Sequence, residues 1–149
     1  MPRLAGVLQR LRRDAARLAQ LDGRTALDLM RASCELALAR VELLAADPEA
    51  WLAKRPGRRR PDELALIDRV AFAIPRMGAR VPWRSSCLVQ ALAARRWLAS
   101  KGVASELHLG ARKPADGDME AHAWLTAGGR TVVGGEPGDY QPFRPSRQP

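Results

Sequence analysis

The period of the hydrophobic pattern changes at Lys101 and Gly102, and this change constrains the fold more than any other feature. Before it, from Leu88 to Ala99, apolar residues recur at the spacing of a helix face. After it, residues 104–111 alternate as in a strand. A cation followed by glycine is typical of a helix end. We therefore predict a helix that leads through a tight turn into a sheet.

Two later segments, residues 121–126 and 130–133, alternate in the same way, and Gly128 with Gly129 predicts a hairpin between them. Residues 4–46 have helical spacing with a break near residues 21–23, where Asp22 or Thr25 is expected to cap the second helix. A further short helix is predicted from Pro61 to about Ala73, and Pro75, Gly78 and Pro82 are expected to keep it from continuing. Helices followed by a small antiparallel sheet predict an α+β fold.

The 149 residues suit a single domain with a modest core. We divide it into an N-terminal helical region, residues 1–60, and a core, residues 61–140. The arginine-rich segment 54–61 is expected to be an exposed connection, and the tail from Pro137 is expected to fray.

The chain is strongly basic, with a net charge of +9 and a pI near 11.1 that come mostly from arginine. Such a charge attracts nucleic acid, anionic membranes or acidic proteins, and does not choose among them. The aromatic residues, 5% of the chain, form no ladder with basic residues, which disfavours nucleic acid. The N-terminus lacks an apolar run long enough for a membrane span or a secretory signal. We therefore expect a cytoplasmic protein without a membrane partner.

The two cysteines lie in different patterns. Cys34 falls on the apolar stripe of the second predicted helix, which predicts a small buried residue. The two thiols form neither a CxxC pair nor a cluster with histidine, which argues for a reducing compartment and against a disulfide framework or a zinc site. No metal or cofactor is predicted. The stripe consists of Leu27, Met30, Cys34, Leu38, Val41 and Leu44.

Cys87, in contrast, directly follows Ser85 and Ser86, which are good helix caps, and precedes the apolar run. A cysteine in the first turn of a helix lies near unpaired backbone N–H groups and the positive end of the helix dipole. Both favour thiolate over thiol. This position is therefore suited to a nucleophile.

A nucleophilic cysteine needs a base, and the chain has two histidines. His108 lies between Leu107 and Leu109, which are expected to face the core and to turn the imidazole outward. His122 shares its strand face with Trp124, beside a loop over residues 113–118 that is suited to forming the rim of a cleft. The spacing favours His122, and an ordinary structural histidine is the alternative at either position.

The segments SSCLVQALAARRWLASKGVASELHLGARK and AHAWLTAGGRTVVGG occur in this order. Together, over roughly residues 64–136, they resemble the transglutaminase-like cysteine proteases that remove leader peptides in lasso-peptide biosynthesis. The resemblance implies that Cys87 attacks the scissile carbonyl to give an acyl-thioester. It implies His122 as general base and acid, after which water releases the leader. The Cys87 N–H and a donor from residues 83–86 are expected, on physical grounds, to hold the oxyanion.

The third member of the catalytic triad departs from the family pattern. Relatives place an aspartate on or just after the strand that follows the histidine, and here that segment is RTVVGGEPGD. Glu136 is the predicted orienting carboxylate, with Asp139, Asp118 and Glu120 as alternatives. A Cys–His dyad with a backbone or amide orienter is the other alternative.

Fused members of this family carry an N-terminal winged-helix module that binds the leader, whereas residues 4–46 have a helical pattern. The resemblance therefore implies the stand-alone protease half of a split pair. Its partners are then the precursor peptide, a separate leader-binding protein and the lasso cyclase. Two alternatives stay open. One is a basic binding module, for nucleic acid or protein, in which Cys87 is only buried at a helix start, and the other is an acyltransferase in which an amine replaces water.

Overall fold

The computed structural model describes residues 22–45, 57, 61–114, 117–136 and 138–143. Within these residues the chain forms three helices and then a four-stranded sheet, which confirms the predicted α+β fold. The helices are α2 (Gly23–Ala45), α4 (Glu63–Gly78) and α5 (Cys87–Ser100). The strands are β1 (Glu106–Arg112), β2 (Glu120–Ala127), β3 (Arg130–Val133) and β4 (Gln141–Pro142). The first predicted helix, most of the arginine-rich connection and the end of the tail lie outside the described residues.

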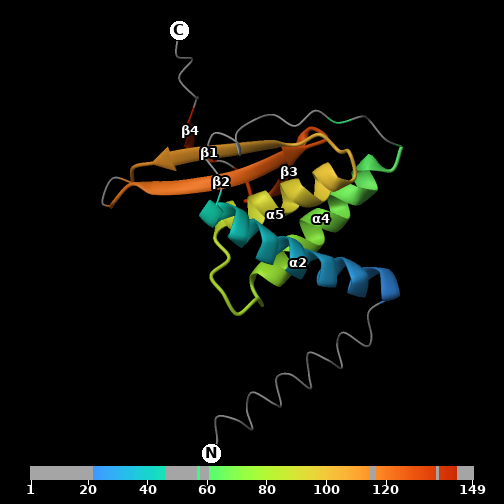
Figure 1. Ribbon diagram of the computed structural model, residues 1–149. Helices are drawn as coiled ribbons and strands as arrows, with labels where there is room; N and C mark the ends of the chain where they lie inside the picture. Colours follow the sequence, from blue (N-terminus) through green and yellow to red (C-terminus); the bar gives the residue numbers. More distant parts are fainter. Residues whose placement is uncertain (1–21, 46–56, 58–60, 115–116, 137, 144–149) are drawn as a thin grey trace, which may run out of the picture.

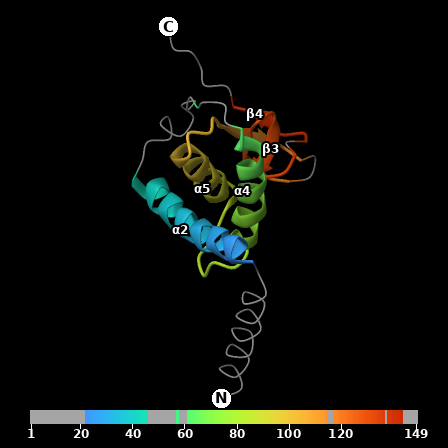
Figure 2. The ribbon, with the colours of Figure 1, turned by 90° about the vertical axis from the view of Figure 1, so that its right-hand side faces the viewer.

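The described elements form layers (Figure 1). The sheet has the strand order β3-β2-β1-β4, and its paired strands are antiparallel. Helices α4 and α5 pack against one face of the sheet, and α2 packs against these two helices. Figure 2 shows α2 crossing the other helices on the side away from the strands. The core therefore lies around α5, and its largest fully buried side chain is Trp97.

At residues 101 and 102, where the hydrophobic pattern changes from helical to strand spacing, the structure has the predicted helix end and turn. The α5 helix ends at Ser100, and Gly102 has a φ of +72°, a left-handed conformation that favours glycine. The Val103 N–H donates to the Leu98 carbonyl at 3.0 Å, which closes the turn into β1. The strands predicted over residues 121–126 and 130–133 are β2 and β3, joined through Gly128 and Gly129.

The α4 helix runs further than predicted, because it continues through Pro75 to Gly78. Pro75 has no N–H to donate to the preceding turn, but its own carbonyl accepts from the Ala79 N–H at 3.1 Å. Ala73 and Ile74 are fully buried, and Met77 packs against the same core. Burial of this last turn outweighs the hydrogen bond that the proline removes.

The buried face of α2 is not the stripe that the sequence pattern indicated. Cys34 is exposed, and so are the other members of the stripe, so the prediction that Cys34 is buried was wrong. Both faces of this helix carry apolar residues, and small Ala32 and Ala39 on the opposite face allow close packing against α4 and α5. Asp28 on that face accepts a hydrogen bond from Arg69 of α4 at 2.6 Å, which fixes the orientation. The buried residues are Asp28, Leu29, Ala32, Leu36 and Ala39.

The start of α2 is capped as predicted by Asp22, whose carboxylate accepts from the Thr25 N–H at 3.0 Å. The Thr25 hydroxyl also donates to it, at 2.6 Å. These bonds, the hydroxyl bond first, lower the pKa of Asp22.

Candidate active site

Cys87 is the first residue of α5, and its thiol is half-buried against the hydrophobic core. Ser86 is the N-cap, and its hydroxyl accepts from the Val89 N–H at 3.4 Å. The location predicted for Cys87 is therefore confirmed. A thiol at a helix start lies beside backbone N–H groups that have no partner inside the helix, and these groups favour negative charge.

His122 is the third residue of β2, and its imidazole Nε2 lies 2.6 Å from the Gly134 carbonyl oxygen. A carbonyl only accepts hydrogen bonds, so Nε2 carries the proton of the neutral ring. Nδ1 is then the unprotonated nitrogen, which is the form that a general base needs. A backbone group thus orients the imidazole, as in the dyad alternative.

Gly134 reaches this position only because it has no side chain. Its φ is +95°, and a Cβ placed on it would lie 2.6 Å from the Ala123 carbonyl oxygen and 2.7 Å from the Trp124 Cα. Any side chain at residue 134 would force the turn after β3 away from β2. The glycine pair that replaces the family's aspartate is therefore the element that brings a carbonyl to His122.

Two aromatic rings flank the imidazole. Tyr140 lies 4.8 Å from His122 between ring centroids, and Trp124 lies 6.0 Å away in a stacked arrangement. The Tyr140 hydroxyl donates to Glu120 at 3.2 Å, and the Arg112 Nε donates to the same carboxylate at 2.7 Å. Tyr140 is thus fixed over the imidazole by an acidic and a basic side chain.

The hydrogen bonds that join Arg112, Glu120 and Tyr140 also shift pKa values beside His122. The hydrogen bond from Arg112, followed by its charge, lowers the pKa of Glu120. The same pair raises the pKa of Arg112. Glu120 is therefore ionised and bonded to Arg112 and Tyr140, and it is not available to orient His122.

Glu136, the predicted third member, lies exposed in the segment after β3. Within the parts of the chain that the structure describes, its carboxylate has no hydrogen bond or ion pair, and Gly134 occupies the place beside Nε2. Asp118 and Asp139 are also exposed. The orienting role of Glu136 stays a prediction.

Cys87 and His122 lie at the same end of the layers. The α5 helix turns back into β1, and β1 is antiparallel to β2, so α5 and β2 both begin at that end (Figure 1). They project on different sides, because Ala123 and Leu125 face the helices and alternation turns His122 to the other face of β2. No hydrogen bond joins thiol and imidazole among the described side chains. A working dyad therefore requires a rearrangement at the start of β2 that brings the imidazole to the helix side of the sheet.

His108 has a different set of contacts. It lies on the outer face of β1, as predicted, and stacks on Trp124 with 5.4 Å between ring centroids. Its Nε2 lies 2.9 Å from the Thr126 hydroxyl. His108 is thus held by Trp124 and Thr126 as a half-buried structural residue.

The comparison with family models identifies the superfamily of this chain. A model described as Transglutaminase-like superfamily matches residues 28–148. The chain belongs to the transglutaminase-like superfamily. Searches of the curated proteins and of the solved structures returned no match. The family includes cysteine peptidases and transglutaminases, so the superfamily part of the predicted resemblance is confirmed.

The loop before Cys87 holds two buried polar atoms that have no hydrogen-bond partner among the described residues. Trp83 Nε1 and Ser85 Oγ are buried, and neither has a hydrogen bond within the described part of the chain. Most buried polar atoms in proteins are paired, so such atoms call for an explanation. Both belong to the loop of residues 83–86, where an oxyanion donor was predicted.

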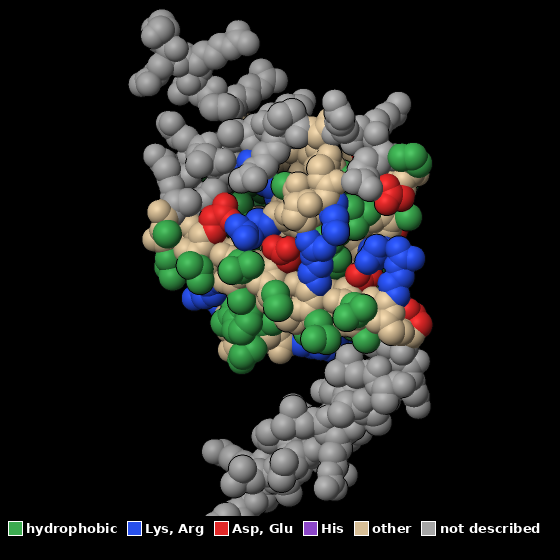
Figure 3. Space-filling model, turned by 45° about the vertical axis from the view of Figure 1, so that its right-hand side comes forward, with side chains coloured by type: hydrophobic (Ala, Val, Ile, Leu, Met, Phe, Trp, Pro, Cys, Tyr) green, Lys and Arg blue, Asp and Glu red, His purple; other side chains and the backbone are tan. Residues whose placement is uncertain are grey.

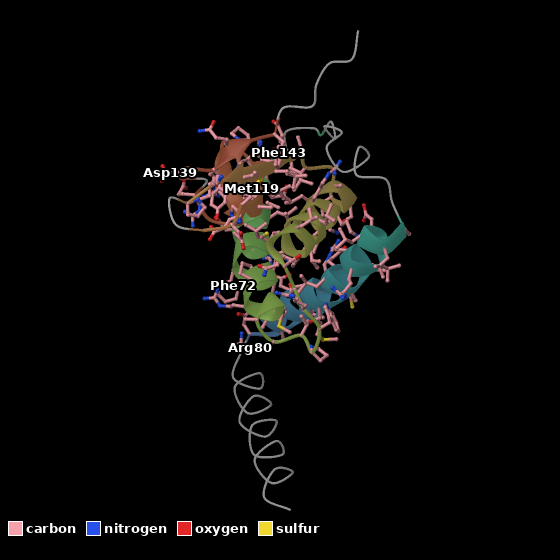
Figure 4. The ribbon with its side chains drawn as sticks, turned by 90° about the vertical axis from the view of Figure 1, so that its left-hand side faces the viewer. Phe72, Arg80, Met119, Asp139 and Phe143 are labelled. Carbon is pink, nitrogen blue, oxygen red and sulfur yellow. The ribbon has the colours of Figure 1, made fainter. Side chains whose placement is uncertain are left out.

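An open hollow of about 630 Å³ lies at the end of the sheet, beside the rings of His122, Trp124 and Tyr140. Figure 4 shows Met119 and Asp139 at this end, well apart from Phe72 on α4. Arg112 joins the hollow to the cluster, because its guanidinium lies 4.7 Å from the centroid of the Tyr140 ring. The predicted rim is confirmed for Lys113 and Pro114, while residues 115–116 lie outside the described parts. The lining residues are Ala111, Arg112, Lys113, Pro114, Met119, Asp139 and Gln141.

The described residues contain no cluster of metal ligands and no helix suited to spanning a membrane. Among these residues, no three histidine, cysteine or acidic side chains gather as a metal site would require. None of the described helices combines the length and the apolar character needed to cross a membrane.

The sequence pattern predicts Cys87 and His122 as site residues, and it gave no role to Gly134 or Tyr140, which contact His122 in the structure. The signal for Gly134 was its place directly after a strand, where a pair of glycines marks a turn that needs positive φ. No pattern in the sequence pointed to Tyr140, because it reaches His122 from beyond a turn 18 residues later.

Proposed function

We propose that this chain is a cysteine peptidase that removes the leader peptide from a ribosomally synthesised lasso precursor, acting with a separate leader-binding protein. The observation that carries the proposal is the thiol of Cys87 at the start of α5, at the same end of the fold as His122, whose Nε2 is held by the Gly134 carbonyl. The superfamily match supports the peptidase class. The lasso assignment rests on the resemblance of residues 64–136.

In the proposed reaction His122 Nδ1 takes the Cys87 proton as the sulfur attacks the scissile carbonyl carbon. The oxyanion is held by the Cys87 N–H and by Trp83 Nε1, the unpaired donor of the preceding loop. The carbon–nitrogen bond then breaks, and the imidazolium returns the proton to the leaving amine. Water attacks the acyl-thioester, gives its proton to His122 and releases the leader with a free carboxylate. The thiol is regenerated when the sulfur leaves.

The hollow beside Arg112 and Lys113 supports peptide binding at this end of the sheet. The net charge of +9 suits an acidic leader or an acidic partner. We include the lasso cyclase as a further partner, because a precursor freed of its leader is the substrate that a cyclase consumes. Two free cysteines suit a reducing compartment, which supports a cytoplasmic location.

The test is cleavage of a candidate lasso precursor by the purified chain, with and without the leader-binding protein, followed by mass spectrometry. The proposal predicts two fragments whose masses sum to the precursor plus one water. A fragment that instead carries an added amine would replace the peptidase with the acyltransferase alternative. An intact precursor, in the presence of both proteins, would contradict the proposal.

A further inference from the structure

A side chain of α5 ties the loop before Cys87 to the helix that carries the thiol. Residues 82–85 lie between α4 and the cap of α5, and no backbone–backbone hydrogen bond joins them to the rest of the described chain. Gln90 Nε2 instead donates to the Ser85 carbonyl at 3.1 Å, in a partly buried contact. Because Gln90 follows Cys87 by three residues, the loop is held against the turn of α5 that begins with the nucleophile.

A second contact, from Arg40 of α2, reaches the same loop at the molecular surface. Arg40 Nη1 donates to the Arg84 carbonyl at 3.2 Å, and both residues are exposed. Figure 3 shows hydrophobic side chains gathered on the lower part of the visible face, where α2 forms the outer layer. Water competes with a hydrogen bond at the surface, so the partly buried bond from Gln90 is the stronger constraint on the loop.

The bond to the Ser85 carbonyl also sets the direction of the N–H in the same peptide unit. The described peptide bonds are trans, so the Ser86 N–H points opposite to that carbonyl and away from the Gln90 amide. The donors proposed for the oxyanion, Trp83 Nε1 and the Cys87 N–H, lie on either side of this peptide along the chain. An oxyanion hole works because its donors are held in place before the charge develops. Fixing this peptide therefore fixes the spacing of the two donors.

The end of α4 packs against the Gln90 amide because residue 78 is glycine. A Cβ placed on Gly78 would lie 2.9 Å from Gln90 Cδ, 3.0 Å from its Nε2 and 3.1 Å from Ser85 Oγ. Ordinary contacts between such atoms begin at about 3.5 Å. A side chain on residue 78 would therefore push the amide away from the Ser85 carbonyl.

We propose that Gln90 is a positioning residue of the acyl-transfer site: it holds the loop before Cys87 so that Trp83 Nε1 and the helix amides converge on one oxyanion. Gln90 acts through the loop and not on the substrate itself. The inference rests on the proposed function, because it needs an oxyanion that forms at Cys87.

Steady-state cleavage of the precursor by Gln90→Met tests the proposal, because methionine has nearly the size of glutamine but no donor. We expect kcat to fall about 10- to 100-fold with KM within about threefold, since misplaced donors weaken binding of the transition state alone. Ser100→Ala is the matched control, because it removes the 2.7 Å bond to the Trp97 carbonyl at the far end of α5. It should leave kcat unchanged. A kcat of Gln90→Met equal to that of wild type overturns the proposal.

Gly78→Ala tests the same contact without altering Gln90. Alanine suits a helix better than glycine, and the atoms that it displaces belong to the end of a flexible side chain, so the fold should tolerate it. We expect kcat to fall about 10-fold while the urea midpoint does not fall. A lower midpoint with an unchanged kcat would mean that the contact only supports the fold, and it overturns the proposal.

Gln90→Glu adds a pH signature that a purely structural role does not produce. An ionised carboxylate has no proton to donate to the Ser85 carbonyl, whereas the protonated form donates through its hydroxyl. The ratio of the variant's kcat to that of wild type should therefore rise as the pH falls from about 7 to about 5, toward the ordinary pKa of glutamate. A ratio that stays constant or falls contradicts the proposal.

An activated ester, p-nitrophenyl acetate, separates this inference from the proposed function. In the Cys34→Ala background Cys87 is the remaining thiol, and it takes the acetyl group, releases p-nitrophenolate and passes through the same kind of oxyanion without leader or partner. If the chain turns over the ester but not the precursor, the peptidase proposal fails, and the ester kcat of the Gln90 variants decides the role of Gln90. If it acts on neither, no oxyanion forms at Cys87 and both proposals fail.

Discussion

The start of α5 and the start of β2 carry the two residues of the proposed dyad, and they are built in opposite ways. At the start of α5 the thiol, its cap and the buried polar atoms of Trp83 and Ser85 come from five consecutive residues, 83–87. At the start of β2 the imidazole depends on Gly134 and Tyr140, which follow it by 12 and 18 residues. The nucleophile is therefore positioned by local structure, and its base by packing between segments.

The largest effect, a loss of precursor cleavage, is expected from substitution of Cys87 at the start of α5. Cys87→Ala removes the nucleophile and should lower precursor cleavage on the order of 10⁴-fold or more, because the sulfur forms the covalent intermediate. Cys34→Ala is the matched control, since Cys34 is exposed on α2 and its substitution should leave cleavage within about twofold. Cleavage is followed by mass spectrometry. Equal activity of the two variants would remove the role proposed for Cys87.

At the start of β2, the largest loss of stability is expected from substitution of Gly134. Gly134→Ala adds a methyl group where the Ala123 carbonyl lies 2.6 Å away, at a φ of +95°, and should lower the free energy of unfolding by about 3 kcal/mol. The control is Gly135→Ala, which also has positive φ but meets no atom within 4 Å, and should cost about 1–2 kcal/mol. Urea denaturation measures both. Equal losses would mean that the close approach to β2 does not matter.

A smaller effect is expected from the helix cap. Ser86→Ala removes the hydroxyl that accepts from Val89 and should lower the free energy of unfolding by about 1 kcal/mol. Because the cap acts locally, the His122 ring should keep its chemical shifts in this variant. A shift of the His122 resonances as large as the one that Gly134→Ala causes would contradict the separation of the two sites.

The smallest effect on stability is expected from protonation of Glu120 at low pH. The pKa of Glu120 is lowered in the folded state by Arg112, so this group stabilises the fold above its unfolded pKa and loses that contribution as pH falls through its folded pKa. Wild type should therefore be more stable than Glu120→Gln at neutral pH, and the difference should vanish in acid below the folded pKa. Urea midpoints at both conditions check this. A difference that grows on acidification would reverse the sign.

The sequence predicted those features whose causes are close together along the chain. The cap before Cys87, the end of α5 at Gly102 and the hairpin at Gly128 and Gly129 each depend on neighbouring residues, and each is present. The run of α4 through Pro75 depends on burial of Ile74, which the local pattern does not contain.

The face of α2 could not be predicted for the same reason. Both of its faces are apolar, and the choice depends on the fit of Ala32 and Ala39 against other helices and on the bond between Asp28 and Arg69. The orienter of His122 is likewise a backbone carbonyl, which has no signature in residue types. Side-chain patterns therefore point to candidate reactive groups but not to the backbone groups and packing that position them.

The burial of α5 has a consequence for the timescales of the site. This helix packs against α2, α4 and β2 together, and the consecutive residues Ala91, Leu92 and Ala93, which point to different sides of it, are all buried. The hydrogen-bonded amides in the buried turns of α5 should exchange with solvent only through global unfolding, while those at the start of β2 should exchange through local opening. Cys87 thus begins a helix that is packed on several sides, and the motion that the proposed dyad requires is expected at the start of β2.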